Sequence, residues 1–287
     1  MGNKVQQVRP PAVAGAFYNG QTQTLQNDVN GLLQMAHAQA EIDDANNENS
    51  NGKILPKALI VPHAGYIYSG PTAAAAYVRL AALSTTIKRV VLLGPVHRVP
   101  IRGLALPGLS AFATPLGEIK IDQQAVSAIE NMPQVVVSPA AHELEHSLEV
   151  QLPFLQSVLE DFQLLPLAVG DVSPADVAEV LEALWGGPET LIVISSDLSH
   201  FLPYETAQTV DAGTAHSILN LSGPLSHEQA CGGTPVNGLI LAARQHHMQP
   251  HLLDMRNSGD TAGDKDRVVG YAAFAFTETG TGQQGGH

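Results

Sequence analysis

Histidines stand just after three short apolar segments of the chain. His63 follows Lys57 to Val61 (KALIV), His97 follows Arg89 to Leu93 (RVVLL), and Asp197 and His200 follow Thr190 to Ser195. Imidazole and carboxylate groups ligate transition metals and exchange protons near neutral pH. A single histidine after a strand is most often a hydrogen-bonding residue, but three at equivalent places indicate a shared site.

The lone cysteine, Cys231, begins the Gly-rich turn CGGTP, and Pro235 stands at the first turn of the helix predicted after it. A helix N-terminus favours the thiolate form, which is the form that binds metals. An isolated cysteine is equally often a small buried apolar residue. The local sequence leaves both interpretations open.

The segment His142-Glu143-Leu144-Glu145-His146 satisfies the HExxH pattern of zinc hydrolases. That pattern requires both histidines on one face of a helix. Here the strand predicted at Gln134 to Val137 and Pro139 place it in a loop or a first helical turn, and the leucines from Leu144 to Leu159 form an apolar stripe that the histidines do not share. We expect His146 or Glu145 to face a pocket as an acid/base or supporting group.

The segments that must position these residues alternate between strand and helix patterns, which predicts an α/β fold with a central, mostly parallel or mixed sheet flanked by helices. Besides the three strands above, β-branched runs predict strands at Gln134 to Val137, Phe162 to Val169 and Arg267 to Phe276. Helices are expected at Gln21 to Ala40, Thr72 to Leu83, Asp122 to Asn131, Ser147 to Leu159, Pro174 to Trp185, Glu205 to Asn220 and Pro235 to His246. Ligands of open α/β sheets bind at the carboxyl ends of the strands, where the histidines stand.

The composition of the chain excludes several classes of function. The 287 residues include 14 Lys plus Arg against 27 Asp plus Glu, so the net charge is −13, with a pI near 5.2. Such a chain lacks the positive field that nucleic acid or an anionic membrane requires. One cysteine excludes an internal disulfide framework. With no apolar leader segment at its N-terminus and no long apolar run, the chain is expected to be cytoplasmic.

We expect one domain over residues 1–287, with a core at about 8–276. The polar stretch Glu41 to Gly52 is rich in Asn and acidic residues, which predicts a mobile loop. The Gly-rich stretch Thr277 to His287 predicts a flexible tail.

Six sequence blocks together resemble the successive motifs of the Memo family, whose bacterial and archaeal members are often named AmmeMemoRadiSam system protein B. The blocks are PHAGYIYSG, LLGPVHR, TPLGEIKID, EHSLEVQLPF, ISSDLSHF and CGGTPVNGL, and the likeness runs from about Val8 to Phe276. This family is similar in fold to the class III extradiol dioxygenases, which are non-haem iron enzymes with an α/β architecture.

The resemblance implies a metal pocket formed by His63, His97 and Cys231, with iron as the first expectation and copper or zinc as alternatives. Two imidazoles and a thiolate differ from the two-histidine, one-carboxylate triad of the dioxygenases, and sulfur shifts the preference toward Cu(I), zinc or an electronically different iron. Ring cleavage therefore does not follow from the fold. A dioxygenase-like site would use His200 as proton shuttle beside Asp197, His146 as a further pocket group, and Tyr66 as a donor to bound oxygen.

These observations lead to three functional expectations. The first is a metal-binding, dioxygenase-like protein with redox or oxygen chemistry on a small substrate. The second is a non-catalytic module that binds a small ligand or peptide, since eukaryotic members of the family are linked to signalling. The third is a zinc hydrolase using His142, Glu143 and His146. The family's bacterial name also implies a radical SAM protein and an AMMECR-type protein as partners.

Overall fold

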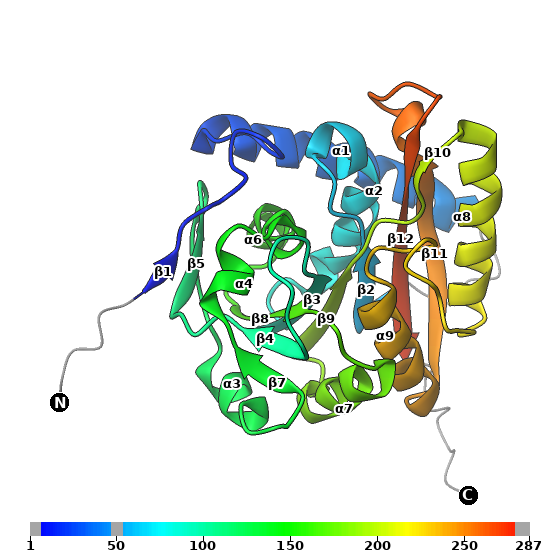
Figure 1. Ribbon diagram of the computed structural model, residues 1–287. Coiled ribbons are helices and arrows are strands. Elements are labelled where there is room, and N and C mark those ends of the chain that lie inside the picture. The colour runs from blue at the N-terminus through cyan, green and yellow to red at the C-terminus, as the bar shows by residue number, and fades with distance from the viewer. Residues whose placement is uncertain (1–6, 47–53, 279–287) are drawn as a thin grey trace, which may run out of the picture.

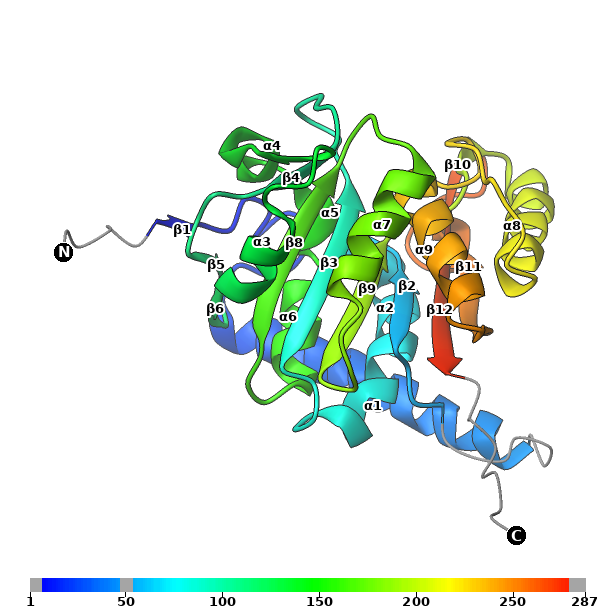
Figure 2. The ribbon, with the colours of Figure 1, turned by 90° about the horizontal axis from the view of Figure 1, so that it is seen from below.

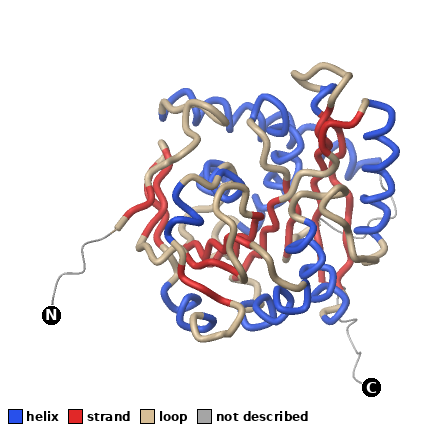
Figure 3. The backbone as a smooth tube through the Cα atoms, in the orientation of Figure 1, coloured by secondary structure: helices blue, strands red, loops and turns tan. Residues whose placement is uncertain are grey.

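The computed structural model describes residues 7–46 and 54–278. Helices cover both faces of a large sheet, and a small sheet lies beside it (Figures 1 and 3). The large sheet has nine strands in the order β10-β12-β2-β9-β3-β8-β4-β7, with β11 paired to β12 outside this path. The expectation of a mixed α/β fold with helices on both sides of the sheet is confirmed.

Four parallel neighbours form the centre of the large sheet. They are β2 (Ala58–Val61), β9 (Thr190–Ser195), β3 (Arg89–Pro95) and β8 (Gln163–Val169). All four coincide with predicted strands to within two residues at either end. Nearly every residue in them is buried, as expected of parallel strands covered on both faces.

Antiparallel pairing appears only toward the edges of this sheet. On one side β12 (Val268–Glu278) runs antiparallel to β2, and it also pairs with β10 (His200–Leu202) and β11 (Met248–Asn257). On the other side β4 (Leu104–Leu106) runs antiparallel to β8 and parallel to β7 (Val135–Val137). The small sheet contains β1 (Val8–Arg9), β5 (Ala111–Thr114) and β6 (Gly117–Lys120).

Alternation of side chains along the central strands creates two apolar cores. Ala58 and Ile60 belong to the core on one face of the sheet, and Leu59 and Val61 to the core on the other. The first core is closed by α3 (Gln123–Ile129), α7 (Pro174–Leu184) and α9 (Gly233–Gln245), and the second by α1 (Thr22–Asn46), α2 (Tyr66–Tyr77) and α6 (Leu152–Val158). Figure 2 shows α7 and α9 in front of the parallel strands. Each leucine or isoleucine that is fully buried there stabilises the fold by roughly 1.5–3 kcal/mol.

Two helices differ from their predicted bounds at the N-terminal half of the chain. The helix α1 continues to Asn46, so residues 41–46 are helical rather than part of a loop, and residues 47–53 lie outside the described residues. The helix α2 begins at Tyr66 and passes through Pro71 before the 3-10 turn Val78–Leu83. Pro71 removes the helical partner of the Ile67 carbonyl, but Ile67 is 69% exposed and within reach of water.

The helix predicted at Ser147 to Leu159 is divided in two. A short helix, α5, covers His146–Glu149, and α6 begins at Leu152 with Pro153 in its first turn. Proline lacks the N–H that would continue the α5 hydrogen bonds, so a new helix begins there. Before α5, α4 covers Pro139–Glu143, and the long helix α8 (Tyr204–Leu219) packs against β11 and β12. In the described residues, no helix has the length and hydropathy needed to cross a membrane.

Candidate metal centre

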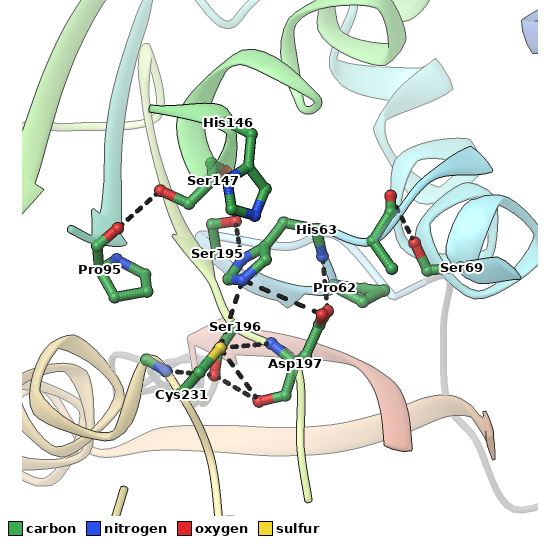
Figure 4. A network of polar contacts seen from close by, with 12 residues as sticks. Pro62, His63, Ser69, Pro95, His146, Ser147, Ser195, Ser196, Asp197 and Cys231 are labelled. Carbon is green, nitrogen blue, oxygen red and sulfur yellow. Dashed lines mark hydrogen bonds and ion pairs between the residues drawn. The ribbon is translucent and has the colours of Figure 1, made fainter. Parts of the chain in front are cut away.

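Three neighbouring parallel strands bring the predicted residues to one edge of the sheet. The strand β9 lies between β2 and β3, and all three run in the same direction. His63 follows β2, Asp197 follows β9 and His97 follows β3, so they meet where the carboxyl ends of these strands lie together. Figure 4 shows His63 between Asp197 and His146 in this region. The structure thus brings these predicted residues together at one edge of the sheet.

Three imidazoles form the centre of the site. Donor atoms of His63, His97 and His146 all lie within 4.8 Å of one another, and the ring centroids are 4.6–5.4 Å apart. His63 is buried, whereas the side chains of His146 and His97 are 17% and 31% exposed. The three rings therefore reach from the interior to the surface, and a small ligand is able to approach the outer two.

Hydrogen bonds fix which nitrogen of His63 faces the site. Its Nδ1 lies 2.9 Å from the Oγ of Ser195, and that hydroxyl donates its only proton to the carbonyl of Ser147 at 2.6 Å. The hydroxyl must therefore accept a proton from Nδ1, and Nε2 keeps a free lone pair. Burial, followed by the nearby His97, lowers the pKa of His63 to about 3, so the ring is neutral and able to ligate a metal at neutral pH.

Glu145 orients His97 in the same manner. The carboxylate accepts hydrogen bonds from the His97 backbone N–H at 2.5 Å and from the His97 Nδ1 at 2.8 Å. Because a carboxylate only accepts, Nδ1 carries the proton and Nε2 is left free for a ligand. Histidines that ligate metals commonly donate their other nitrogen to such a group, which fixes the orientation of the ring.

The same carboxylate begins α5 and so places His146. Its Oε1 accepts from the backbone N–H groups of His146 and Ser147, both at 3.0 Å, as the N-cap of that helix. Burial raises the pKa of Glu145, but the hydrogen bonds from His97 and Ser147 outweigh burial and hold the pKa at about 2. Burial and the nearby His63 lower the pKa of His146 to about 4. The His146 Nδ1 lies 3.3 Å from this carboxylate and is buried without a hydrogen bond to any described residue.

A buried ion pair holds the segment that carries Glu145, and sequence reasoning missed it. Arg9 donates to Glu149 at 2.6 Å, to the Glu145 carbonyl at 2.7 Å and to the His142 carbonyl at 2.6 Å. Glu149 also accepts from the hydroxyl of Tyr18 at 2.6 Å. These partners are more than 130 positions apart in the chain, so no local pattern indicates the contact. Its only sequence signal is that both acids stand in the block EHSLEVQLPF.

Cys231 lies on the other side of His63 from His146 (Figure 4). Its Sγ is 3.2 Å from the unprotonated Nε2 of His63 and accepts a hydrogen bond from the backbone N–H of Asp197 at 3.3 Å. Burial and the Asp197 carboxylate raise the pKa of the thiol to about 12, so without a cation nearby it is protonated. Gly232 permits this close approach, because a Cβ there would lie 2.8 Å from the Ser195 carbonyl oxygen.

Asp197 and His200 surround the cluster without joining it. The Asp197 carboxylate accepts from the His63 backbone N–H at 2.7 Å, and its other oxygen lies 4.0 Å from the His63 Nε2. Burial raises the pKa of Asp197. The Nδ1 of His200 donates to the Leu198 carbonyl at 2.9 Å, so its Nε2 is the basic nitrogen. His200 belongs to β10, which pairs with β12.

The HELEH segment does not form the helix that a zinc hydrolase requires. The helix α4 ends at Glu143 and α5 begins at His146, so the two histidines stand on separate helices. His142 is buried, and its Nε2 donates to the Ala105 carbonyl at 2.8 Å, away from the other imidazoles. Arg9 holds both sides of the break, which explains why the motif is not one continuous turn of helix.

Tyr66 also differs from its expected role. Its hydroxyl donates to the Val150 carbonyl at 2.7 Å, and its ring packs against Phe154 and Tyr18. The single hydroxyl proton is therefore engaged in joining α2 to the end of α5 rather than offered to a ligand at the cluster.

A cleft of about 590 Å³ lies beside the cluster, a volume that suits a small organic ligand. His97 and Cys231 are among the residues that line it. The chain from Pro95 to Ile101 forms one wall, and Thr234 and Pro235 at the start of α9 form another. His97 and Cys231 are thus reached from a space large enough for a small ligand.

Comparison with known proteins gives one family along nearly the whole chain. Residues 9–275 match the family model described as Memo-like protein. A MEMO1 family protein of Aquifex aeolicus is 35% identical and covers 94% of this chain and 99% of its own length. MEMO1 family proteins of Ignicoccus hospitalis and Metallosphaera sedula are 34% and 31% identical, each covering 94% of this chain and 98% and 99% of their own lengths.

Solved structures give a more distant likeness. The crystal structure of the uncharacterised protein JW3007 of Escherichia coli K12 has a TM-score of 0.47 and 15% sequence identity, and covers 76% of this chain and 98% of that chain.

Proposed function

The chain belongs to the Memo family, and we propose that it binds iron, or alternatively copper, at the three-imidazole cluster and carries out redox or oxygen chemistry on a small substrate. The observation that carries this proposal is the convergence of His63, His97 and His146 within 4.8 Å. Imidazole nitrogens suit iron, copper and zinc, and a nearby thiolate adds preference for the softer of these ions.

The residues present fit such an ion. His63 and His97 each have one nitrogen engaged by a hydrogen bond that leaves Nε2 free, and His146 supplies a buried nitrogen with no hydrogen bond to the described residues. We assign these three as ligands and the Cys231 sulfur, 3.2 Å from the His63 Nε2, as a fourth donor. Binding of a cation at this sulfur would release its proton, since a thiolate is the ligating form.

A bound iron or copper ion supplies one-electron redox chemistry and Lewis acidity. The chain's own groups then hold and move protons. His200, whose free Nε2 is its basic nitrogen, is the proposed proton shuttle, and Asp197 is the neighbouring acid that stabilises its protonated form. The Glu145 carboxylate keeps His97 in one orientation, and the cleft positions the substrate.

Elemental analysis of protein purified without oxygen tests this proposal. The wild type is compared with His97→Ala and Cys231→Ala, and with the control His37→Ala, which removes a histidine that is 58% exposed on α1. We expect nearly one equivalent of iron or copper in the wild type and in the control, little in His97→Ala, and a reduced amount in Cys231→Ala. Zinc bound equally by all four proteins, or no metal in any of them, would reject the redox proposal.

A binding module without turnover is the second candidate, and the cleft is the observation that favours it. A space of about 590 Å³ holds a ligand whether or not a reaction follows. Oxygen consumption by the iron-loaded protein separates the two candidates. Substrate-dependent consumption that disappears in His200→Gln supports catalysis, whereas a ligand that binds without any consumption supports the module.

A further inference from the structure

Arg98 is a cation without a partner on the wall of the cleft beside the cluster. It follows His97 directly, is exposed, and lines the cleft. Within the described parts of the chain, its guanidinium makes no hydrogen bond and no ion pair. Five other arginines do donate hydrogen bonds to carboxylates or carbonyls, namely Arg9, Arg79, Arg89, Arg244 and Arg256.

The rest of the cleft limits what this cation is able to recognise. The wall around Arg98 is mainly apolar, with Val96, Val99 and Ile101 on one side and Pro235 on the other. Asp171 is the only carboxylate among the described lining residues, and it forms no ion pair with Arg98. A ligand that satisfies this space therefore carries an anionic group on a small apolar body.

The net charge of the molecule distinguishes the Arg98 guanidinium from most of the surface. A net charge of −13 repels anions from most of the surface, so a free guanidinium is a local exception. Arginine offers a planar fork of donors that matches a carboxylate in two hydrogen bonds. The start of α9, a helix of 13 residues, adds a weaker positive potential at the same cleft through Thr234.

We propose that the cleft binds a small apolar monocarboxylate and that Arg98 holds its carboxylate. Arg98 then determines specificity by placing the body of the ligand next to His97 and Cys231. This inference deepens the proposed function and rests on it for the reaction that follows binding. Recognition of the anion is a property of the cleft and is measured without metal.

The test uses phenylacetate and its neutral analogue phenylacetamide, titrated calorimetrically into the metal-free full-length protein. We expect wild type to bind phenylacetate at least about tenfold more tightly than phenylacetamide, as one charge-assisted pair provides. Arg98→Gln should lose this preference and Arg98→Lys should keep part of it. Lys120→Gln, which removes an exposed charge on β6 away from the cleft, should behave as wild type. Circular dichroism confirms that each variant is folded.

The outcomes separate this inference from the proposed function. If wild type shows no preference for the anion, or if Arg98→Gln retains the full preference, the inference is overturned whatever the metal content. If the preference depends on Arg98 but the protein binds no iron or copper, the anion site stands and the redox proposal fails. An equal loss in Lys120→Gln would reduce the effect to net charge and also overturn the assignment to Arg98.

Discussion

Glu145 links two of the proposed ligands, because one carboxylate orients the His97 ring and starts the helix that carries His146. Replacing Glu145 by Gln keeps the shape of the side chain but removes its negative charge. Four N–H groups donate to that charge, namely the backbone and Nδ1 of His97 and the backbones of His146 and Ser147. We expect Glu145→Gln to weaken metal affinity by about 10- to 100-fold, measured by competition with a chelator. Glu143→Gln is the matched control, since Glu143 is exposed on α4. Equal affinity in both variants would show that Glu145 does not support the site.

The buried His142 gives a prediction for the stability of the protein in acid. Burial lowers its pKa from 6.5 to about 4, so the folded protein keeps the ring neutral while the unfolded chain takes up a proton below pH 6.5. Stability is therefore lost as the pH falls from 6.5 toward 4, and His142 accounts for on the order of 3 kcal/mol of that loss. His142→Gln, which retains a donor for the Ala105 carbonyl, should lose less stability over this range in urea titrations. An identical pH dependence in wild type and variant would contradict this account.

The two short helices α4 and α5 depend on an element at the opposite end of the sequence. Arg9, in β1, neutralises the buried Glu149 and holds the carbonyls of Glu145 and His142. Arg9→Ala leaves a buried carboxylate without its partner, and we expect the free energy of unfolding to fall by about 3–5 kcal/mol. The double variant Arg9→Met, Glu149→Leu should recover only part of this stability, because the Tyr18 hydroxyl and two backbone N–H groups lose their acceptor. It should also bind metal less tightly, because the Glu145 carbonyl has lost its donor. Urea unfolding measures the change in stability, and competition with a chelator measures the change in metal affinity. If Arg9→Ala changed neither quantity, this ion pair would not position α5.

The strand patterns in the sequence predicted those site residues that the parallel strands position. His63, His97 and Asp197 follow buried β-branched runs, and the carboxyl ends of parallel neighbours must meet. The position of His146 depends instead on the Glu145 N-cap and on the contact of Arg9 with the Glu145 carbonyl, which no local pattern indicates. The strand β11 was missed because it is half exposed at the edge of the sheet and contains Pro250, so its pattern lacks the apolar alternation of a strand.

At the scale of the whole molecule, the proposed donors join parts of the chain that are far apart in sequence. His63, His97, His146 and Cys231 come from the ends of β2 and β3, from α5 and from the turn before α9. An ion that binds only the folded form should therefore stabilise the entire domain. At 100 times its dissociation constant it contributes about 2.7 kcal/mol, which raises the Tm by roughly 5–10 °C in a protein of this size. Differential scanning calorimetry should show this increase in wild type but not in His97→Ala, and an equal increase in both would place the ion elsewhere.

The measurement that tests the central claim most directly is a crystal structure of protein loaded with Fe²⁺ without oxygen, with data collected at the iron absorption edge. We predict one strong anomalous peak within bonding distance of the Nε2 atoms of His63 and His97, bounded by His146 and by the sulfur of Cys231. A peak that avoids His63 and His97, or no peak in a protein that binds iron in solution, would contradict the assignment of this cluster as the metal centre.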